Sequence, residues 1–411
     1  TGAISTRFDL AIEANNIIPM EETYEEVKVD EEDERQIQEL AADSKVFDKL
    51  SQSIALSIWG YDEIKKALVL QMFGGVRKVA TDRSVKRGDI HILLIGDPGV
   101  AKSQILKFVA NIAPRGRYIV GRATSGAGLT ATVVRDEFLK GWALEAGAMV
   151  LANKGIVCID EIEKMDPNDR SAMHEALEQQ TVTISKANVQ ASLKSETSVL
   201  AAGNPKLGRF EPFQTIAQQI ELPPTLINRF DVIFPLRDMP DKFRDESIAT
   251  HVLSQYQKQD RILPVERDLF RKYVAYAKQK VKPILTDDAI KEIKEFYIKM
   301  RNTPVSADAG GSKAIHISAR QLEALVRLSE AHAKLRLSKK VTKEDAKVAI
   351  EVLTYYLMQV GYDYETKTFD IDKIAVGVST SQRSKVILLR EVIARLEEKL
   401  GKFIPLQELE K

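Results

Sequence analysis

The chain has 411 residues and a mass of 46.0 kDa, enough for two or three domains with substantial cores. Hydrophobic residues make up 44% of the chain, but no apolar run approaches about 18 residues, which argues against a membrane span. The single cysteine, Cys158, excludes an internal disulfide and a cysteine-based zinc site, consistent with a reducing compartment. A formal net charge of +1 does not favour nucleic acid by itself, so such a partner must be argued from local charge.

The first residues are expected to be the end of something longer. The chain has no initiating Met and no signal pattern, so we expect an excised part of a longer protein. Partial alternation in residues 1–20 is typical of a strand, predicted to end a preceding N-terminal β domain. Residues 21–45 are rich in acids and are predicted to be a solvated acidic linker, with a helical pattern from about Asp33.

A phosphate-binding loop is predicted where an apolar run from Ile90 ends in a tight turn and a helical pattern begins near Gln104. Such a turn directs backbone N–H groups and a helix N-terminus at one point, which favours a polyanion. Lys102 can then reach the β- and γ-phosphates, and the Ser103 hydroxyl can ligate Mg²⁺. Ala101 stands where the usual motif has Gly, so this stretch alone also fits an ordinary strand–turn–helix. The predicted nucleotide-contacting residues are Gly96, Asp97, Pro98, Gly99, Val100, Ala101, Lys102, Ser103 and Gln104.

An adenine pocket is predicted upstream of this loop. Ile58, Trp59 and Gly60 precede a helix expected at about residues 62–73, and a Gly between aromatic side chains suits the wall of such a pocket. The same residues are equally typical of a helix C-cap followed by a new helix start.

Two later apolar runs are predicted to be buried parallel strands that end in polar residues. Asp160 and Glu161 follow one run, and Asn204 follows the other. Strand carboxyl ends line the ligand crevice of an open α/β sheet. There Asp160 can hold Mg²⁺, Glu161 can deprotonate a water, and Asn204 can bond the γ-phosphate or that water. The alternatives are an acid-rich helix start and an Asn turn before Pro.

The remaining patterns complete the predicted organisation. Turn-rich and β-like residues at about 123–143 are predicted to form an inserted hairpin, followed by a helix-compatible stretch over 143–151. A second hairpin is expected at 181–193, with Lys186 at its tip. We therefore expect an α/β core at 46–240 and a smaller all-α unit at 241–360. A mixed linker at 361–380 and a further helical unit at 381–411 follow.

The motifs together resemble the minichromosome maintenance (MCM) replicative helicases, a branch of the AAA+ ATPases, and the chain looks archaeal-like. The resemblance extends over about residues 50–360 and rests on the loop at 96–103, on Ile-Asp-Glu at 159–161 and on Leu-Ile-Asn-Arg-Phe-Asp at 226–231. That family uses Ala before the loop lysine. The departures replace no group that does chemistry: they are Ile162 and Glu163 for Phe-Asp, Gly203 for Ala, and Asn228 for Ser.

The resemblance implies an AAA+ P-loop NTPase: a parallel sheet flanked by helices with β-hairpin inserts, plus an α-helical lid. The ends would be the last of the N-terminal domain and a truncated winged helix. By resemblance, Lys102 and Ser103 bind phosphate and Mg²⁺, Asp160 supports the metal, Glu161 is the catalytic base and Asn204 is sensor 1. Arg229 would be the arginine finger of a neighbouring subunit, and Arg320 would be sensor 2, also acting in trans.

The resemblance also implies partners: ATP and Mg²⁺ as cofactors, DNA bound without sequence preference, and a homo-oligomeric ring, hexameric in the full-length protein. Lys186 and the 123–143 insert would face the channel. We expect this fragment to hydrolyse ATP but to assemble weakly, down to a monomer when isolated. The implied location is the archaeal nucleoid or a eukaryotic nucleus, with no membrane.

Two other functions stay open on the sequence. One is a different AAA+ machine with inserted hairpins, such as a metal-chelatase-like or protein-remodelling ATPase; the basic hairpin tip and the winged-helix-like tail favour DNA over polypeptide. The other is a nucleotide-binding scaffold without turnover, against which Glu161 and Arg229 argue.

Overall fold

The structure is a computed structural model, and it describes residues 24, 26–82, 84–122, 126–136, 141–186, 189–211, 219–257, 263–302, 317–363 and 368–369. The predicted β-domain end at 1–20 and the winged-helix start at 381–411 lie outside these residues. Of the predicted linker at 361–380, the structure describes the end of α13 (Lys343–Gly361) and a short antiparallel pair, β14 (Tyr362–Asp363) with β15 (Thr368–Phe369).

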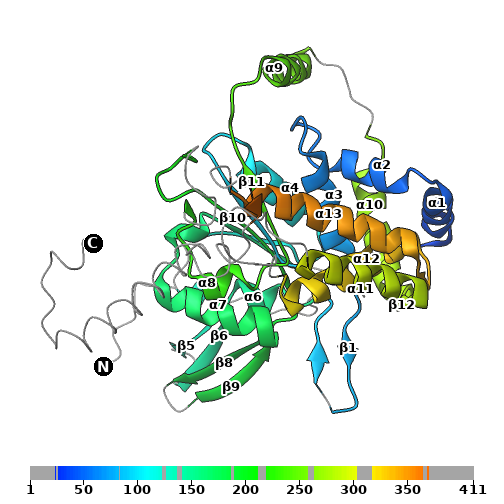
Figure 1. The fold of residues 1–411 in the computed structure, drawn as a ribbon. Coiled ribbons are helices and arrows are strands. Elements are labelled where there is room, and N and C mark those ends of the chain that lie inside the picture. Colours follow the sequence, from blue (N-terminus) through cyan, green and yellow to red (C-terminus); the bar gives the residue numbers. More distant parts are fainter. Residues whose placement is uncertain are drawn as a thin grey trace, which may run out of the picture.

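A five-stranded parallel sheet occupies the centre of the molecule (Figure 1). Its order is β11 (Val232–Leu236), β3 (Ile92–Gly96), β10 (Ser198–Gly203), β7 (Ile156–Asp160) and β4 (Arg117–Val120). Every residue of β3, β7 and β10 is buried, as expected of near-continuous apolar strands in a sheet covered on both faces. Because all five strands run the same way, their carboxyl ends share one edge of the sheet, and their amino ends share the other.

Helices pack against this sheet, and one of them is hydrogen-bonded to the starts of two of its strands. The predicted helix at 62–73 is α3 (Asp62–Phe73), preceded by α2 (Val46–Ser53), and α4 (Lys102–Ile112) packs on β4, β7 and β10. Buried Gln71 ties α3 to the starts of two strands, because its Nε2 donates to the Ile90 and Val199 carbonyl oxygens at 3.0 and 2.9 Å. Downstream lie α7 (Pro167–Gln179) and α8 (Pro224–Ile227), and α13 packs against β11 at the sheet edge.

Two antiparallel hairpins extend from the α/β core and contact each other through β5 and β8 (Figure 1). They are β5 (Ala131–Asp136) with β6 (Gly141–Ala146), preceded by α5 (Gly126–Leu129), and β8 (Thr181–Lys186) with β9 (Val189–Lys194). The predicted helix over 143–151 is too long. Residues up to Ala146 pair in β6, and only α6 (Ala148–Leu151) is helical. A third, unpredicted hairpin, β1 (Lys78–Val79) with β2 (Val85–Lys86), projects from the body with all four residues exposed.

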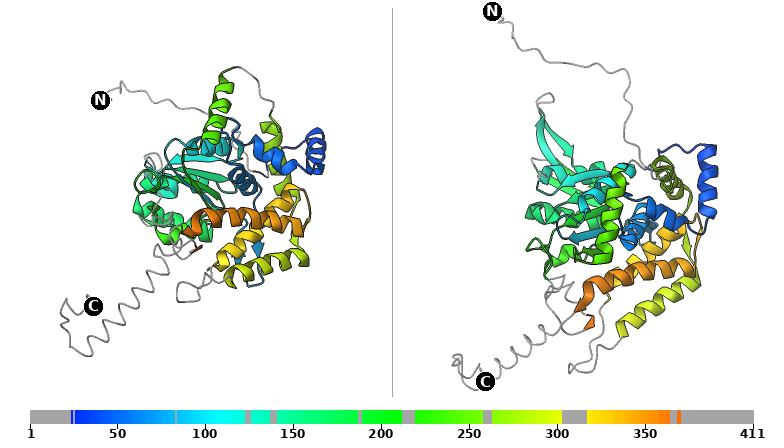
Figure 2. Two further views of the ribbon diagram at one scale, coloured as in Figure 1. Left: turned by 45° about the horizontal axis from the view of Figure 1, so that its top comes forward. Right: turned by 90° about the horizontal axis from the view of Figure 1, so that it is seen from above.

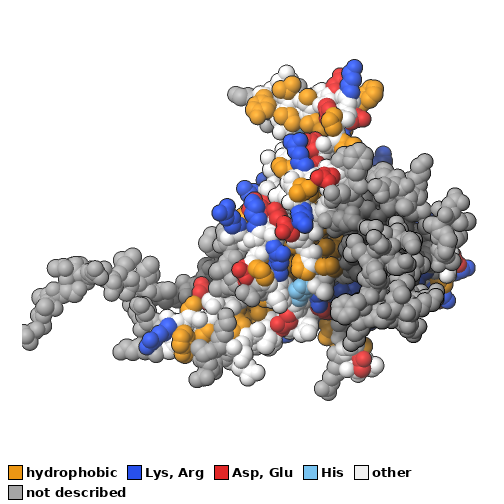
Figure 3. Space-filling model, turned by 60° about the vertical axis from the view of Figure 1, so that its left-hand side comes forward, with side chains coloured by type: hydrophobic (Ala, Val, Ile, Leu, Met, Phe, Trp, Pro, Cys, Tyr) orange, Lys and Arg blue, Asp and Glu red, His pale blue; other side chains and the backbone are white. Residues whose placement is uncertain are grey.

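The predicted all-α unit forms from α10 onward. It comprises α10 (Arg267–Lys280), α11 (Asp287–Asn302), α12 (Ala319–Leu335) and α13, with a short parallel pair of β12 (Ile284–Leu285) and β13 (Lys340–Val341). Helix α9 (Lys242–Tyr256) stands apart from these helices and buries none of its residues (Figure 2). Apolar side chains such as Phe243, Leu253 and Tyr256 are exposed on it. In Figure 3 the segment at the top of the molecule shows many hydrophobic side chains in orange. Within the described residues, no helix is long and apolar enough to cross a membrane.

The helical pattern predicted from about Asp33 is confirmed, but the prediction that 21–45 is solvated is wrong at Tyr24, Val27 and Ile37, which are buried. Residues Glu31–Ala42 form α1, and its run of acids occupies the first helical turn, where carboxylates favour the positive end of the helix dipole. Asp33 also pairs with Lys272 of α10 at 2.6 Å, and Ile37 is fully buried. The acids therefore cap a helix that packs on the lid.

Candidate nucleotide site

The turn between β3 and α4 has the backbone of an anion-binding loop. Gly99 and Ala101 both have left-handed backbone angles, with φ of 88° and 62°. Alternation of this kind turns successive N–H groups toward one point beside the start of α4. The conformation costs a residue with a Cβ about 1–2 kcal/mol, so Ala101 carries strain where Gly would carry none.

Lys102 lies beneath this loop and is only 8% exposed. Its Nζ donates to the carbonyl oxygens of Gly96 and Asp97, at 2.7 Å each, which uses two of its three donors. Burial lowers the pKa of Lys102, while the carboxylates of Asp160, Asp97 and Glu163 act to raise it. The next side chain, Ser103, is exposed. The loop thus presents one buried ammonium and one accessible hydroxyl.

The Asp97 side chain anchors the loop. Its Oδ1 accepts from the Phe210 amide and its Oδ2 from the Asp238 amide, both at 2.8 Å. These amides belong to the segments after β10 and after β11, so one carboxylate ties three strand ends together. The sequence predicted Asp97 only as a member of the nucleotide loop, and nothing in its spacing signals these two distant amides.

Asp160 and Glu161 follow β7 at the same edge. Asp160 is 6% exposed; its Oδ2 accepts from the Tyr118 hydroxyl at 2.8 Å and its Oδ1 from the Glu161 amide at 3.0 Å. Glu161 has a left-handed backbone (φ 52°), a strained state for a non-Gly residue that clusters at functional sites. Its Oε1 accepts from Lys164 at 2.6 Å. Sequence reasoning missed Tyr118, which lies on β4, the edge strand next to β7.

Asn204 follows β10, between the strands that carry the loop and the two acids. Its Nδ2 donates to Oε1 of Glu163 at 2.9 Å. The structure therefore brings the predicted Lys102, Asp160, Glu161 and Asn204 to the carboxyl edge of three adjacent strands. No group of three or more His, Cys, Asp or Glu side chains suited to a metal occurs in the described part of the chain.

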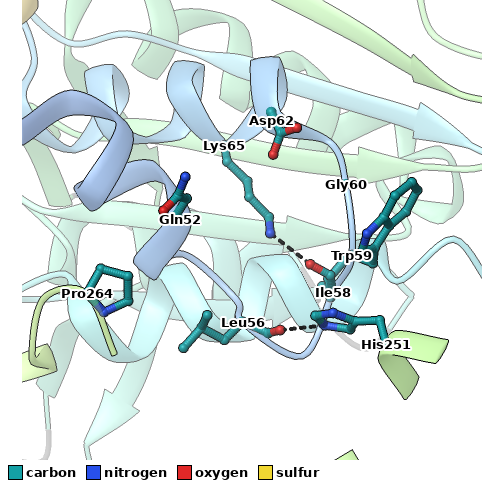
Figure 4. A pocket seen from close by; sticks show the side chains of 9 residues that line it. All are labelled: Gln52, Leu56, Ile58, Trp59, Gly60, Asp62, Lys65, His251 and Pro264. Carbon is teal, nitrogen blue, oxygen red and sulfur yellow. Dashed lines mark hydrogen bonds between the residues drawn. The ribbon is translucent and has the colours of Figure 1, made fainter. Parts of the chain in front are cut away.

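Ile58, Trp59 and Gly60 line a cavity of about 500 Å³ (Figure 4). Lys65 closes one wall, donating to the Ile58 carbonyl oxygen at 2.8 Å, and His251 of α9 lies 2.8 Å from the Leu56 carbonyl oxygen. The other lining residues are Gln52, Asp62 and Pro264. The lining comes from α2, α3, α9, the segment between α2 and α3 and the segment before α10, rather than from the loop at 96–104.

Arg229 and Arg320 meet on one carboxylate, that of Glu178 at the end of α7. Arg229 Nε donates to Glu178 Oε2 at 3.0 Å, and Arg320 from the start of α12 donates to Oε1 at 2.9 Å. Arg229 also contacts the Thr225 carbonyl oxygen at 2.9 Å and the ring of His174. The hydrogen bond from Arg229 is the largest cause that lowers the pKa of Glu178, and the positive charges of Arg229 and Arg320 lower it further. Sequence reasoning missed Glu178.

The arginine pair lies at the edge of the sheet opposite Lys102. Arg229 comes just before β11, whose first residue, Val232, pairs with Ile92, the first residue of β3. Lys102 comes after the last residue of β3. The five residues of β3 span roughly 16 Å at about 3.3 Å per residue. Arg229 therefore does not belong to the site formed by the loop of its own chain.

A buried ion cluster supports the arginine edge. Asp231 accepts from Arg87 at 3.0 and 3.1 Å, from Arg327 of α12 at 2.5 Å and from the His91 amide at 2.7 Å. Burial acts to raise the pKa of Asp231, but the guanidinium groups of Arg327 and Arg87 outweigh it and hold the pKa well below its usual range. The turn that carries Arg229 and the helix that carries Arg320 are thereby joined beneath the surface.

Lys186 is the last residue of β8, and residues 187–188 at the hairpin tip lie outside the described part of the chain. The backbone pairing of Lys186 with Val189 closes the hairpin as predicted.

Two family models match the chain. The MCM P-loop domain covers residues 33–256, and the MCM AAA-lid domain covers residues 268–357. This chain is a member of the MCM family. The lid match begins within α10, so α9 falls in the P-loop match rather than in the lid.

Relatives support the same assignment. The chain is 45% identical, over 95% of its length, to the minichromosome maintenance protein MCM of Saccharolobus solfataricus. It is 41% identical over 88% of its length to the DNA replication licensing factor MCM4 of Arabidopsis thaliana, and 40% identical over 84% to MCM7 of the same plant. The matches cover 56%, 43% and 48% of those relatives, so the chain spans about half their length.

Proposed function

We propose that this chain is the motor of an ATP-driven replicative DNA helicase, which hydrolyses ATP between neighbouring copies in a ring and moves along DNA. The supporting observation is the division of the site. One edge of the sheet carries the loop with Lys102, two acids and an amide, while the arginine pair lies at the opposite edge. Two copies arranged head to tail would join the two halves.

One subunit would bind the nucleotide at the carboxyl edge. The left-handed loop and the start of α4 suit phosphates, and Lys102 has one N–H left beyond its two carbonyl contacts. Ser103 and Asp160 would hold Mg²⁺, which neutralises developing phosphate charge when bound. Glu161 would take the proton of the attacking water, and Asn204 would orient that water or the γ-phosphate. The cavity beside Trp59 would receive the adenine.

The neighbouring subunit would supply Arg229 and Arg320 to the γ-phosphate. Both guanidinium groups already converge on the two oxygens of Glu178, at 2.9–3.0 Å for Arg229 Nε and Arg320. A phosphate, like a carboxylate, offers pairs of oxygens that guanidinium groups can bind, and it carries more negative charge, so it can replace the carboxylate. A finger supplied in trans is worth about 10³–10⁵ in rate and makes hydrolysis depend on assembly.

DNA would pass the paired hairpins β5–β6 and β8–β9. Their mutual contact makes one two-hairpin surface, and Lys186 repeated around a ring would give a circle of positive charge. A translocating motor needs contacts to phosphates, because base readout would stall it, so we propose no sequence preference. We further propose a hexamer for the full-length protein, and weak association for this part of the chain.

The test is steady-state ATP hydrolysis against protein concentration, with and without single-stranded DNA. We expect activity to rise more than linearly with concentration and to be lost in Arg229→Ala. DNA stimulation should be lost in Lys186→Ala but kept in the matched control Lys194→Ala, at the other end of the same hairpin. ATP turnover that does not depend on protein concentration or on DNA would be consistent with an ATPase but would contradict the helicase proposal.

A further inference from the structure

Glu163 is an acid at the carboxyl edge that the mechanism above leaves unused. It lies on a single 3₁₀ turn, η1 (Ile162–Lys164), two residues after Glu161. Its Oε1 accepts from Asn204 Nδ2 at 2.9 Å. Its Oε2 is buried and has no hydrogen-bond partner among the described residues. Its main-chain carbonyl accepts from Arg170, so the residue is held at both ends.

This contact determines which way the Asn204 amide faces. An Asn side chain has a donor end and an acceptor end of nearly the same shape, and only its partners decide which is which. A carboxylate can only accept, so Glu163 selects the NH₂ end and turns the carbonyl oxygen away. The second N–H and the carbonyl oxygen of Asn204 are then available in a fixed orientation for a ligand at the strand ends.

The room for this carboxylate comes from a missing side chain. A Cβ placed on Gly203 would lie 3.0 Å from Glu163 Oε2, 3.1 Å from the Ile162 Cγ2 and 3.2 Å from the Ile95 Cδ1. Those distances are shorter than ordinary van der Waals contacts between such atoms. Any side chain at position 203 would therefore push against the Glu163 carboxylate, which binds the next residue, Asn204.

We propose that Glu163 is a positioning residue for ATP hydrolysis: it orients the amide of Asn204, and Gly203 provides the space in which it does so. The inference rests on the proposed role of Asn204. Glu163 acts through Asn204 and does not touch the reacting atoms. The carboxylate also contributes to the field around Lys102, together with Asp160 and Asp97, so its loss has a second, smaller consequence at the phosphate loop.

The main test is a double-mutant cycle on steady-state ATP hydrolysis with Glu163→Ala, Asn204→Ala and the double variant. We expect Glu163→Ala to lower kcat by about 10–100-fold, the usual loss when an orienting partner is removed, and to leave KM within about threefold. The double variant should be within about threefold of Asn204→Ala alone, because Glu163 has nothing left to orient and only its smaller effect at Lys102 remains. Glu163→Gln, which keeps an acceptor oxygen and the side-chain volume, should retain more activity than Glu163→Ala.

The outcomes separate this inference from the proposed function. Asn204→Ala at wild-type rate would overturn the role of Asn204, and this inference with it. A slow Asn204→Ala beside a fully active Glu163→Ala, or losses that multiply in the double variant together with a lower Tm, would overturn the inference alone.

A second cycle tests the space at Gly203. Gly203→Ala should lower kcat in the wild-type chain, because its methyl group meets Oε2. In a Glu163→Asp background the carboxylate is one methylene shorter, so Gly203→Ala should cause no further loss. The same fold loss in both backgrounds would show that the methyl group acts elsewhere and would overturn this part.

Discussion

The two edges of the sheet in this MCM chain hold their charges in opposite ways. At the carboxyl edge, Lys102 and Asp160 are 8% and 6% exposed; Lys102 donates to backbone carbonyl oxygens, and Asp160 accepts from its half-buried neighbours Tyr118 and Glu161. At the amino edge, the side chains of Arg229 and Arg320 are 20% and 48% exposed, and they share an exposed glutamate. The charged side chains of the carboxyl edge are therefore buried and held in place, whereas those of the amino edge lie at the surface.

The difference indicates which half of the proposed shared site holds side chains that can exchange partners. An exposed ion pair contributes only about 0–1 kcal/mol, so leaving Glu178 costs the two arginines little. The backbone below them does not share this freedom, because Asp231 joins Arg87 and Arg327 in the interior. The amino edge therefore combines a fixed platform with side chains that can exchange partners, as a residue acting on a neighbour requires.

The strongest test of this comparison uses two variants, one that lacks the arginine of the amino edge and one that lacks the lysine of the carboxyl edge. Arg229→Ala and Lys102→Ala should each lower hydrolysis, the former by about 10³–10⁵-fold. In an equimolar mixture, about one interface in four pairs an intact loop with an intact arginine, so about a quarter of wild-type activity should return. ATP hydrolysis before and after mixing measures this. A mixture no faster than its parts would mean that both residues serve the same chain.

Glu161→Gln should give the next largest effect, confined to the carboxyl edge. An amide cannot accept the proton of the attacking water, so kcat should fall by about 10²–10⁴-fold while ATP affinity changes little. Lys102→Ala is the matched control, because it removes a phosphate contact and should weaken ATP binding itself. Calorimetric ATP titration beside single-turnover hydrolysis separates the two. Rapid hydrolysis by Glu161→Gln would assign the base elsewhere.

The carboxyl edge was predictable from the sequence because its signals are local. A continuous apolar run followed within a few residues by a glycine turn, an acid pair or an amide marks the end of a buried parallel strand, and all three runs became neighbouring strands. Phosphate loop and acid pair could each be recognised within about ten residues of chain.

The amino edge could not be predicted in the same way. Glu178 meets Arg229 from 51 residues away and Arg320 from 142, and no periodicity records such pairings. The acidic segment at 21–45 misled for a related reason. Its charge count is that of a solvated linker, but burial of Ile37 and Tyr24 against the lid depends on residues more than 200 positions later.

Asp231→Asn tests the platform beneath the arginines. Removing one partner from a buried ion cluster leaves uncompensated charge on Arg87 and Arg327, so unfolding free energy should fall by about 3–5 kcal/mol. Because the folded pKa of Asp231 is depressed, its contribution is complete above its unfolded pKa, about 4, and is lost only as pH falls through the folded value. Denaturant unfolding should therefore show an undiminished difference between wild type and Asp231→Asn from pH 5 to 8. A difference that faded within that range would contradict the cluster's charge state.

Glu178→Gln should have the smallest effect, and the sign of its kinetic effect is the informative part. The pair is half-exposed, so unfolding free energy should change by less than about 1 kcal/mol, similar to Glu351→Gln on the exposed side of α13. If Glu178 binds Arg229 and Arg320 until they bind the γ-phosphate in a neighbouring copy, removing the charge of Glu178 frees both arginines. Half-maximal ATP hydrolysis should then occur at a lower protein concentration, because association no longer has to break the internal pairs. A shift to higher concentration would mean that Glu178 aligns the two arginines for the neighbouring site instead of competing with it.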